Sequence, residues 1–220
     1  MLRMGVVGLG LLVAVGGCGK QPSAASQPGE SVLAAYRRMR ESCRTGQYRR
    51  LEAMIDPNER IGVVDTLMAV DALLRADRRR EHLLTERYGE AVAELFSLQW
   101  LGNQLGPFSR EVQVVSHRDD GETAVVMVQV ADRLPLEAVR FTRRQGQWVY
   151  LPGPPPTGFV EALDGITAAI EQSTTVLRRD PQMELTAFER YLADHVDPLI
   201  RQAATAAGPP TRQPATRPSR

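Results

Sequence analysis

The stretch DGETAVVMVQV, residues 120–130, decides the class of fold that this chain adopts. It opens with Asp120-Gly121, a dipeptide strongly favoured in two-residue hairpin turns. β-branched residues predominate from Thr123 onward, and every second side chain is apolar. The alternating set is Ala124, Val126, Val128 and Val130, with Val125 and Met127 on the opposite face. This pattern predicts a strand over 123–130 that follows a hairpin turn and has both faces partly covered.

The same alternation appears on both sides of this strand. The alternating residues are Val112 and Val114 before the turn, and Val139 and Phe141 after it. Pro135 suits the start of the later strand, and Gln145-Gly146 predicts a second tight turn before a last strand over 148–151. The sequence therefore predicts an antiparallel meander of four strands.

The apolar period becomes helical before the predicted sheet. Helices are expected over about 32–45, 47–55, 58–79 and 81–101, the last one interrupted at Gly89. Ser31 suits the N-cap of the first helix and Gly46 its end, whereas Asp56-Pro57 breaks the second.

Helical spacing returns after the proline-rich run LPGPPPTG, 151–158. The repeating residues are Phe159, Leu163, Ile166, Ile170, Ser173 and Leu177. Asp180-Pro181 predicts the start of a further helix over 182–199, with a break at Pro198. The first of these helices packs on the second or offers a seam to a partner, and packing within the chain is favoured. The expected fold class is α+β: N-terminal helices on a curved four-stranded meander, then a C-terminal helical hairpin.

Composition and motifs exclude several classes of function. The 220 residues carry a formal net charge of +1, and aromatic residues make up 5%. A nucleic-acid partner is not expected, because general binding to nucleic acid needs a concentrated basic surface. No cofactor is expected, because the chain has no phosphate-binding loop or nucleophile elbow. His82 and His195 have no companion at ligand spacing, so no metal site is predicted.

The N-terminus has the features of an export signal. Arg3 precedes an apolar run from Met4 to about Val15, which is shorter than the roughly 20 residues that cross a bilayer but suits a signal peptide. The next residues, Val15-Gly16-Gly17-Cys18, resemble the cleavage motif of bacterial lipoproteins. This resemblance implies cleavage before Cys18 and attachment of acyl chains to it, so the membrane is an expected partner.

The same resemblance implies a location in the cell envelope. Because Gly19 is not an aspartate, the family rule places the protein on the periplasmic face of an outer membrane, or on the outer face of the plasma membrane where there is only one. The predicted organisation is a signal peptide (1–17), a flexible tether (18–30), an α+β domain (31–151), a C-terminal helical pair (159–206) and a disordered Pro/Arg tail (207–220).

Residues 31–57 and 120–153 resemble the cone-shaped domain of the nuclear-transport-factor-like family. The matching positions are Gly46, Tyr48 and Leu51, then Ala124 to Val128, Gly146 and Trp148. The resemblance implies a cone whose interior binds ligands, or holds an acid–base residue in enzymes. The C-terminal helices are either added outside this cone or plug its open end.

The candidates for chemistry are few. Tyr36, His117, Trp148 and Tyr150 are the expected lining of a cone pocket, and His117, Asp119 and Asp120 are the candidate acid–base groups. Asp119 and Asp120 fall in the predicted hairpin turn, which favours a solvated role. No catalytic residue is assigned, and the chain is not expected to be an enzyme. The favoured hypothesis is a non-catalytic interaction module with an envelope protein partner; the alternative is a small-ligand binder or enzyme using the cone interior.

Two further features have a structural and a functional interpretation. Cys43 shares an apolar helical face with Tyr36 and Met39, which favours an inert buried thiol over a reactive one. Arginines are dense at 37–50 and 78–80 and offer a basic surface. Acidic residues lie among them, namely Glu41, Glu52, Asp77 and Glu81, so a solvated helix face is favoured.

Overall fold

The computed structural model describes residues 29–131, 133–153 and 158–207. The predicted signal peptide, Cys18, nearly all of the predicted tether and residues 208–220 of the predicted tail lie outside the described residues. The predictions made for them stay predictions.

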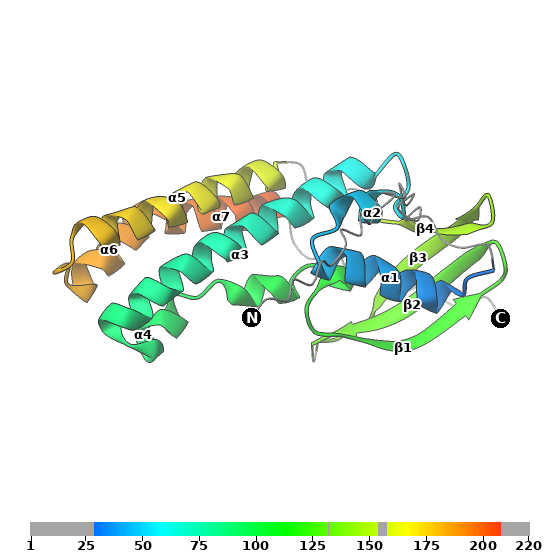
Figure 1. Cartoon of the computed structure of the whole chain (residues 1–220), viewed down its shortest axis with the longest axis horizontal. Coiled ribbons are helices and arrows are strands. Elements are labelled where there is room, and N and C mark those ends of the chain that lie inside the picture. Colours follow the sequence, from blue (N-terminus) through cyan, green and yellow to red (C-terminus); the bar gives the residue numbers. More distant parts are fainter. Residues whose placement is uncertain (1–28, 132, 154–157, 208–220) are drawn as a thin grey trace, which may run out of the picture.

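The elements follow one another as helices, a sheet and further helices (Figure 1). The first group is α1 (Val32–Arg44), α2 (Tyr48–Glu52), α3 (Arg60–Tyr88) and α4 (Glu90–Leu95), then the short 3₁₀ helices η1 (Gln99–Asn103) and η2 (Gly106–Phe108). The strands are β1 (Val112–Asp119), β2 (Thr123–Val130), β3 (Glu137–Arg144) and β4 (Gln147–Leu151). The last group is α5 (Phe159–Arg179), α6 (Leu185–His195) and α7 (Asp197–Ala207). The predicted α+β class is confirmed.

The sheet is the predicted meander, with strands in the order β1-β2-β3-β4 and antiparallel pairing throughout. Ala124 lies opposite Phe141 and Val126 opposite Val139, so the alternating apolar residues of β2 and β3 share one face. The pairing of β1 shifts between Val114 and Ser116, which marks a bulge in this edge strand.

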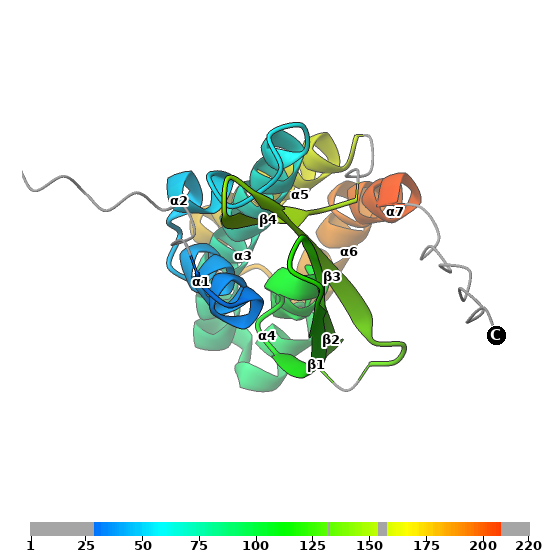
Figure 2. The same cartoon turned by 90° about the vertical axis from the view of Figure 1, so that its right-hand side faces the viewer.

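One hydrophobic core lies between this face of the sheet and the N-terminal helices. α1 contributes Tyr36 and Met39, the strands contribute Val126, Phe141 and Trp148, and all five side chains are buried. Seen from the sheet end, α1 and α2 lie on one side of the strands, and α3 runs away behind them (Figure 2). Residues 54–56 bind the outer edge of β4, where the Tyr150 amide donates to the Met54 carbonyl at 2.8 Å.

α3 is a single helix of 29 residues, so the prediction of separate helices over 58–79 and 81–101 is wrong. Nothing between Arg78 and His82 breaks a helix, because arginine and glutamate both favour helical backbone. The helix ends at Gly89, whose φ of 90° an L side chain would disfavour. As a result α3 extends beyond the sheet and takes part in two cores.

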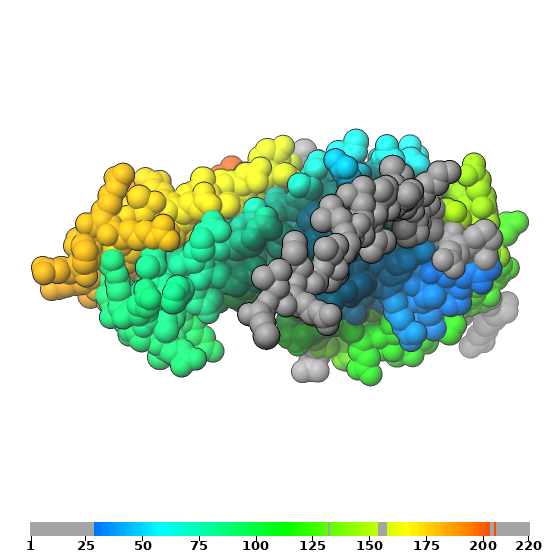
Figure 3. Space-filling view, in the orientation of Figure 1, coloured from blue at the N-terminus to red at the C-terminus, as the bar shows by residue number. Residues whose placement is uncertain are grey.

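The second core lies along the outer part of α3. α3 contributes residues from Ala69 to Leu84, and the C-terminal helices contribute Ile170, Leu177 and Phe188, all fully buried. The prediction that the 159–177 helix packs within the chain is confirmed, although its main neighbour is α3 and not the next helix along. The two cores form one elongated body (Figure 3).

The C-terminal region differs from the predicted hairpin in having three helices. Asp180 does not cap the second one: its carboxylate accepts a hydrogen bond from the Gln182 amide at 3.1 Å and shapes a turn, and α6 begins at Leu185. The predicted break near Pro198 separates α6 from α7, because proline is tolerated in the first turn of a helix but not in its interior. These helices lie on the α3 side, away from the strands (Figure 1), so none of them covers the sheet.

Candidate functional site

A cleft of about 610 Å³ opens between α1, α3 and the segment 102–110. Its apolar residues are mostly buried: Leu67 and Leu74 are 4% and 5% exposed, and Leu105 and Phe108 are half-buried. Its arginines are more exposed, and they are Arg37, Arg40, Arg44, Arg78 and Arg110. The cleft therefore has an apolar floor and a basic rim.

Helical spacing places these side chains. Positions 37, 40, 41 and 44 share one face of α1, and positions 67, 71, 74 and 78 share one face of α3. The third wall is irregular and must be held against α1 by specific bonds. The Tyr36 hydroxyl donates to the Pro107 carbonyl at 3.3 Å, which fastens η2 to α1.

Arg40 also holds the segment 102–110 against α1. Its guanidinium donates to the carbonyls of Ser109 at 3.0 Å, Arg110 at 3.2 Å and Val112 at 3.4 Å. These bonds satisfy backbone oxygens at the point where the chain enters β1. Arg40 is therefore a positioning residue for the cleft wall, and its charge contributes to the positive potential of the cleft.

The acidic residues of the cleft are already compensated. Glu41 binds Arg44 at 2.6 Å, and Asp71 binds Arg75 at 2.7 Å. By contrast, the guanidinium groups of Arg37 and Arg78 form no hydrogen bond or ion pair with any described residue. The rim thus presents arginine donors whose hydrogen bonds the described part of the chain does not use.

Gly102 makes room for the last arginine of the rim. A Cβ atom at this position would lie 2.9 Å from the Arg110 Nε atom, closer than real contacts allow. The Arg110 amide donates to the Gly102 carbonyl at 3.0 Å, and its guanidinium donates to the Gln99 side-chain oxygen at 3.2 Å. The close approach at Gly102 therefore helps to place a positive charge at the rim.

Ser109 adds an unsatisfied polar group to the cleft wall. The residue is 1% exposed, and within the described ranges its hydroxyl has no hydrogen-bond partner. A buried hydroxyl without a partner costs free energy, so such groups are uncommon in native structures. Because the oxygen atom itself is almost inaccessible, it lies behind the surface of the cleft and offers no open contact to a ligand.

The Cys43 thiol and the Tyr48 hydroxyl of the cleft both have raised pKa values. Burial, followed by the nearby Asp71 carboxylate, raises the pKa of the half-buried Cys43 thiol to about 11. Burial also raises the pKa of Tyr48 to about 12, and Asp71 adds to the effect. Both groups stay protonated, because the negative form of each would lie in a poorly solvated place next to a carboxylate.

The predicted cone pocket is not assembled. Tyr36, Trp148 and Tyr150 lie in the first core, 1%, 2% and 8% exposed, whereas His117 lies on the exposed part of β1. His117 is opposite Val126 in the sheet, but the helices that cover Val126 do not extend over it. The structure therefore does not bring the four predicted lining residues together.

The predicted acid–base candidates in the turn are structural. Asp119 accepts a hydrogen bond from the Gly121 amide at 2.7 Å. Asp120 accepts from the Glu122 and Thr123 amides and from the Thr123 hydroxyl. The bonds from Thr123 lower the pKa of Asp120 most. Both carboxylates thus stabilise the hairpin turn as exposed acceptors.

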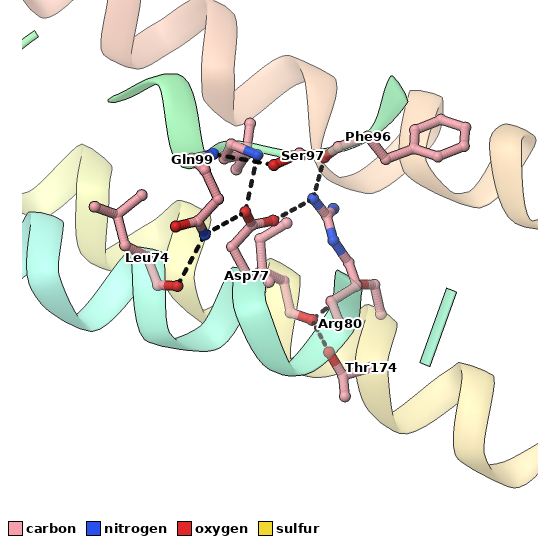
Figure 4. Close-up of polar contacts among 10 residues, drawn as sticks. Leu74, Asp77, Arg80, Phe96, Ser97, Gln99 and Thr174 are labelled. Atoms are coloured by element: carbon pink, nitrogen blue, oxygen red, sulfur yellow. Dashed lines mark hydrogen bonds and ion pairs between the residues drawn. The ribbon is translucent and has the colours of Figure 1, made fainter. Parts of the chain in front are cut away.

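Part of the predicted solvated arginine face is buried. Asp77 and Arg80 are 0% and 2% exposed, and their side chains bind one another at 2.6 Å (Figure 4). Asp77 also accepts hydrogen bonds from the Leu98 amide at 2.8 Å and from the Gln99 side-chain amide at 2.9 Å. Arg80 donates to the Phe96 carbonyl at 2.5 Å. The expectation of a solvated face is wrong here, because the segment 96–99 returns over this turn of α3.

Sequence reasoning missed the cleft. The spacing of Arg37, Arg40 and Arg44 marks one helical face, and this signal was available from the sequence. Neither Arg78 nor Arg110 could be joined to that face, because they are 41 and 73 positions from Arg37 along the chain and only packing brings them near. The orphaned Ser109 hydroxyl has no signature in the sequence.

No group of three or more histidine, cysteine, aspartate or glutamate side chains there is arranged to hold a metal ion. No helix among the described residues combines the length and apolar character needed to span a bilayer.

Comparison of the chain with models of protein families, with curated proteins and with solved structures found no match. The resemblances to bacterial lipoproteins and to the nuclear-transport-factor-like family therefore stay predictions. The cleft has to be interpreted from its own chemistry.

Proposed function

We propose that this protein is a non-catalytic binding module of the cell envelope that holds an anionic ligand in the arginine-lined cleft. One observation carries the proposal: five arginines surround a single cleft whose two acids are both paired. Guanidinium groups bind carboxylate and phosphate through paired hydrogen bonds, and the partly enclosed site strengthens them. The protonated Cys43 and Tyr48 support binding as opposed to catalysis.

A titration with pyrophosphate tests anion binding. The full-length chain carrying Cys18→Ser is titrated by calorimetry at constant ionic strength. Binding is expected for this protein and is expected to fall about tenfold for each of Arg37→Ala and Arg78→Ala, because each removes a charge-assisted contact. Neither change disturbs a bond that the structure shows, so folding is expected to be retained.

Arg140→Ala is the matched control. Arg140 is an exposed arginine of β3, and it does not line the cleft. The substitution removes the same overall charge, so an effect of net charge alone would weaken binding equally in all three variants. Equal weakening, or no binding of pyrophosphate at all, would contradict the proposed site.

The proposed location rests on the lipoprotein-like motif around Cys18. Protein extracted from its own membranes is expected to have, under denaturing conditions, the mass of the chain from Cys18 plus two or three acyl chains. Two or more chains are needed for stable anchoring, since one alone binds reversibly. An intact mass that includes residues 1–17 without lipid would refute the anchor and leave the cleft proposal in place.

A further inference from the structure

The floor of the cleft narrows the chemistry of its ligand. Leu67 and Leu74 come from one face of α3, and Leu105 and Phe108 come from the opposite wall. Leu105 packs against both hydrophobic cores, and Phe108 packs edge-on against Tyr150 at 5.7 Å between ring centroids. These contacts hold the apolar side chains in place at the junction between the two cores.

A purely inorganic anion would use only half of this site. It would bind the rim arginines but leave the half-buried Leu105 and Phe108 uncovered, and burying apolar ligand carbon against them is favourable in proportion to the area removed from water. An uncharged apolar molecule would have the opposite defect, because it would leave Arg37 and Arg78 without an anionic partner. A ligand that satisfies both parts has an apolar body and one anionic end.

Size is consistent with the same ligand class. A cleft of about 610 Å³ falls in the range of roughly 300–1,000 Å³ typical of small-molecule sites.

We infer that the ligand is a single-chain amphipathic anion whose phosphate or carboxylate binds arginines of the rim and whose apolar body covers the floor of the cleft. This inference rests on the proposed function and adds the chemical class of the ligand. It predicts that affinity depends on two independent properties of the ligand. Charge acts through the rim, and chain length acts through the floor.

A series of alkyl phosphates tests the inference below their micelle concentrations. Inorganic, ethyl, butyl, hexyl and octyl phosphate are titrated into the full-length Cys18→Ser chain, with octyl glucoside as the uncharged control. Affinity is expected to rise by up to about fourfold for each methylene that the floor covers. Octyl glucoside is expected to bind at least tenfold more weakly than octyl phosphate.

The variants separate the two contributions. Arg37→Ala combined with Arg78→Ala is expected to weaken every phosphate in the series by a similar factor and to leave the dependence on chain length unchanged. Arg140→Ala is expected to change neither. Methyl NMR signals of Leu67, Leu74 and Leu105 are expected to shift with octyl phosphate and to stay in place with inorganic phosphate, which locates the alkyl chain.

The outcomes distinguish the inference from the proposed function. If inorganic and octyl phosphate bind equally and both depend on the arginines, the proposed anion site stands and the amphipathic ligand is refuted. If octyl glucoside binds as tightly as octyl phosphate, the cleft does not recognise anions and both are refuted. Both are also refuted if no phosphate in the series, and no pyrophosphate, binds.

Discussion

Asp77→Ala is expected to lower the free energy of unfolding by about 3–5 kcal/mol, because it leaves the buried Arg80 guanidinium without its counter-charge. The carboxylate also holds the Leu98 amide and the Gln99 side chain (Figure 4). Its loss would therefore release the segment that leads from α4 into the cleft wall. Urea denaturation monitored by circular dichroism measures the change.

A matched control separates burial from charge pairing. Glu171→Ala breaks the Arg79–Glu171 pair, which joins α3 to α5 at 2.8 Å and has both side chains about half exposed. Its expected cost is below about 1 kcal/mol, since water solvates both partners. The double variant Asp77→Ala, Arg80→Met is expected to be more stable than Asp77→Ala alone, because it also removes the buried guanidinium that would lack a counter-charge. Equal costs for Asp77→Ala and Glu171→Ala would contradict the buried pair.

Phe188→Ala is expected to cost about 3–5 kcal/mol, the usual range for emptying a buried phenylalanine site. Phe188 is 0% exposed in the second core and packs edge-on against Phe96, with ring centroids 6.0 Å apart. The backbone of Phe96 also accepts the hydrogen bond from Arg80, so the cavity would weaken the same segment that Asp77 holds. Thermal unfolding of the full-length chain measures the loss.

Leu95→Ala is the control for the second core. Leu95 is the neighbour of Phe96 in sequence but is 80% exposed, so its truncation is expected to change stability by less than about 0.5 kcal/mol. A comparable loss from Leu95→Ala and Phe188→Ala would show that α6 is not packed as the structure has it. Because Phe188 and Asp77 act on one segment, the costs of the two variants are not expected to add.

Several parts of the fold followed directly from local patterns in the sequence. The alternation in 123–130 and the turn signals at Asp120-Gly121 and Gln145-Gly146 specified the meander. The capping residue Ser31 marked the start of α1, and its side chain accepts the hydrogen bond expected of an N-cap, from the Ala34 amide at 3.3 Å. These features depend on neighbours within a few positions, which is why a linear pattern describes them.

The errors also have local causes. The Asp180-Pro181 pair suits a helix start and a turn equally well. The chain forms the turn, in which the Asp180 carboxylate accepts a hydrogen bond from the Gln182 amide. α3 runs through residues 79–81 without a break, because the arginines and the glutamate there favour helical backbone. Its apolar residues pack first in the core next to the sheet and, from about residue 69, in the second core.

The sequence by itself determined the strands, their order, the α+β class and the helical faces that carry Arg37, Arg40 and Arg44. It did not determine which charged residues lose contact with water. Asp77 and Arg80 have the spacing of an exposed ion pair, and only the return of residues 96–99 over α3 buries them. The cleft likewise exists because α1, α3 and 102–110 meet around one space. Burial and proximity between distant segments are properties of packing, and no period in a linear sequence records them.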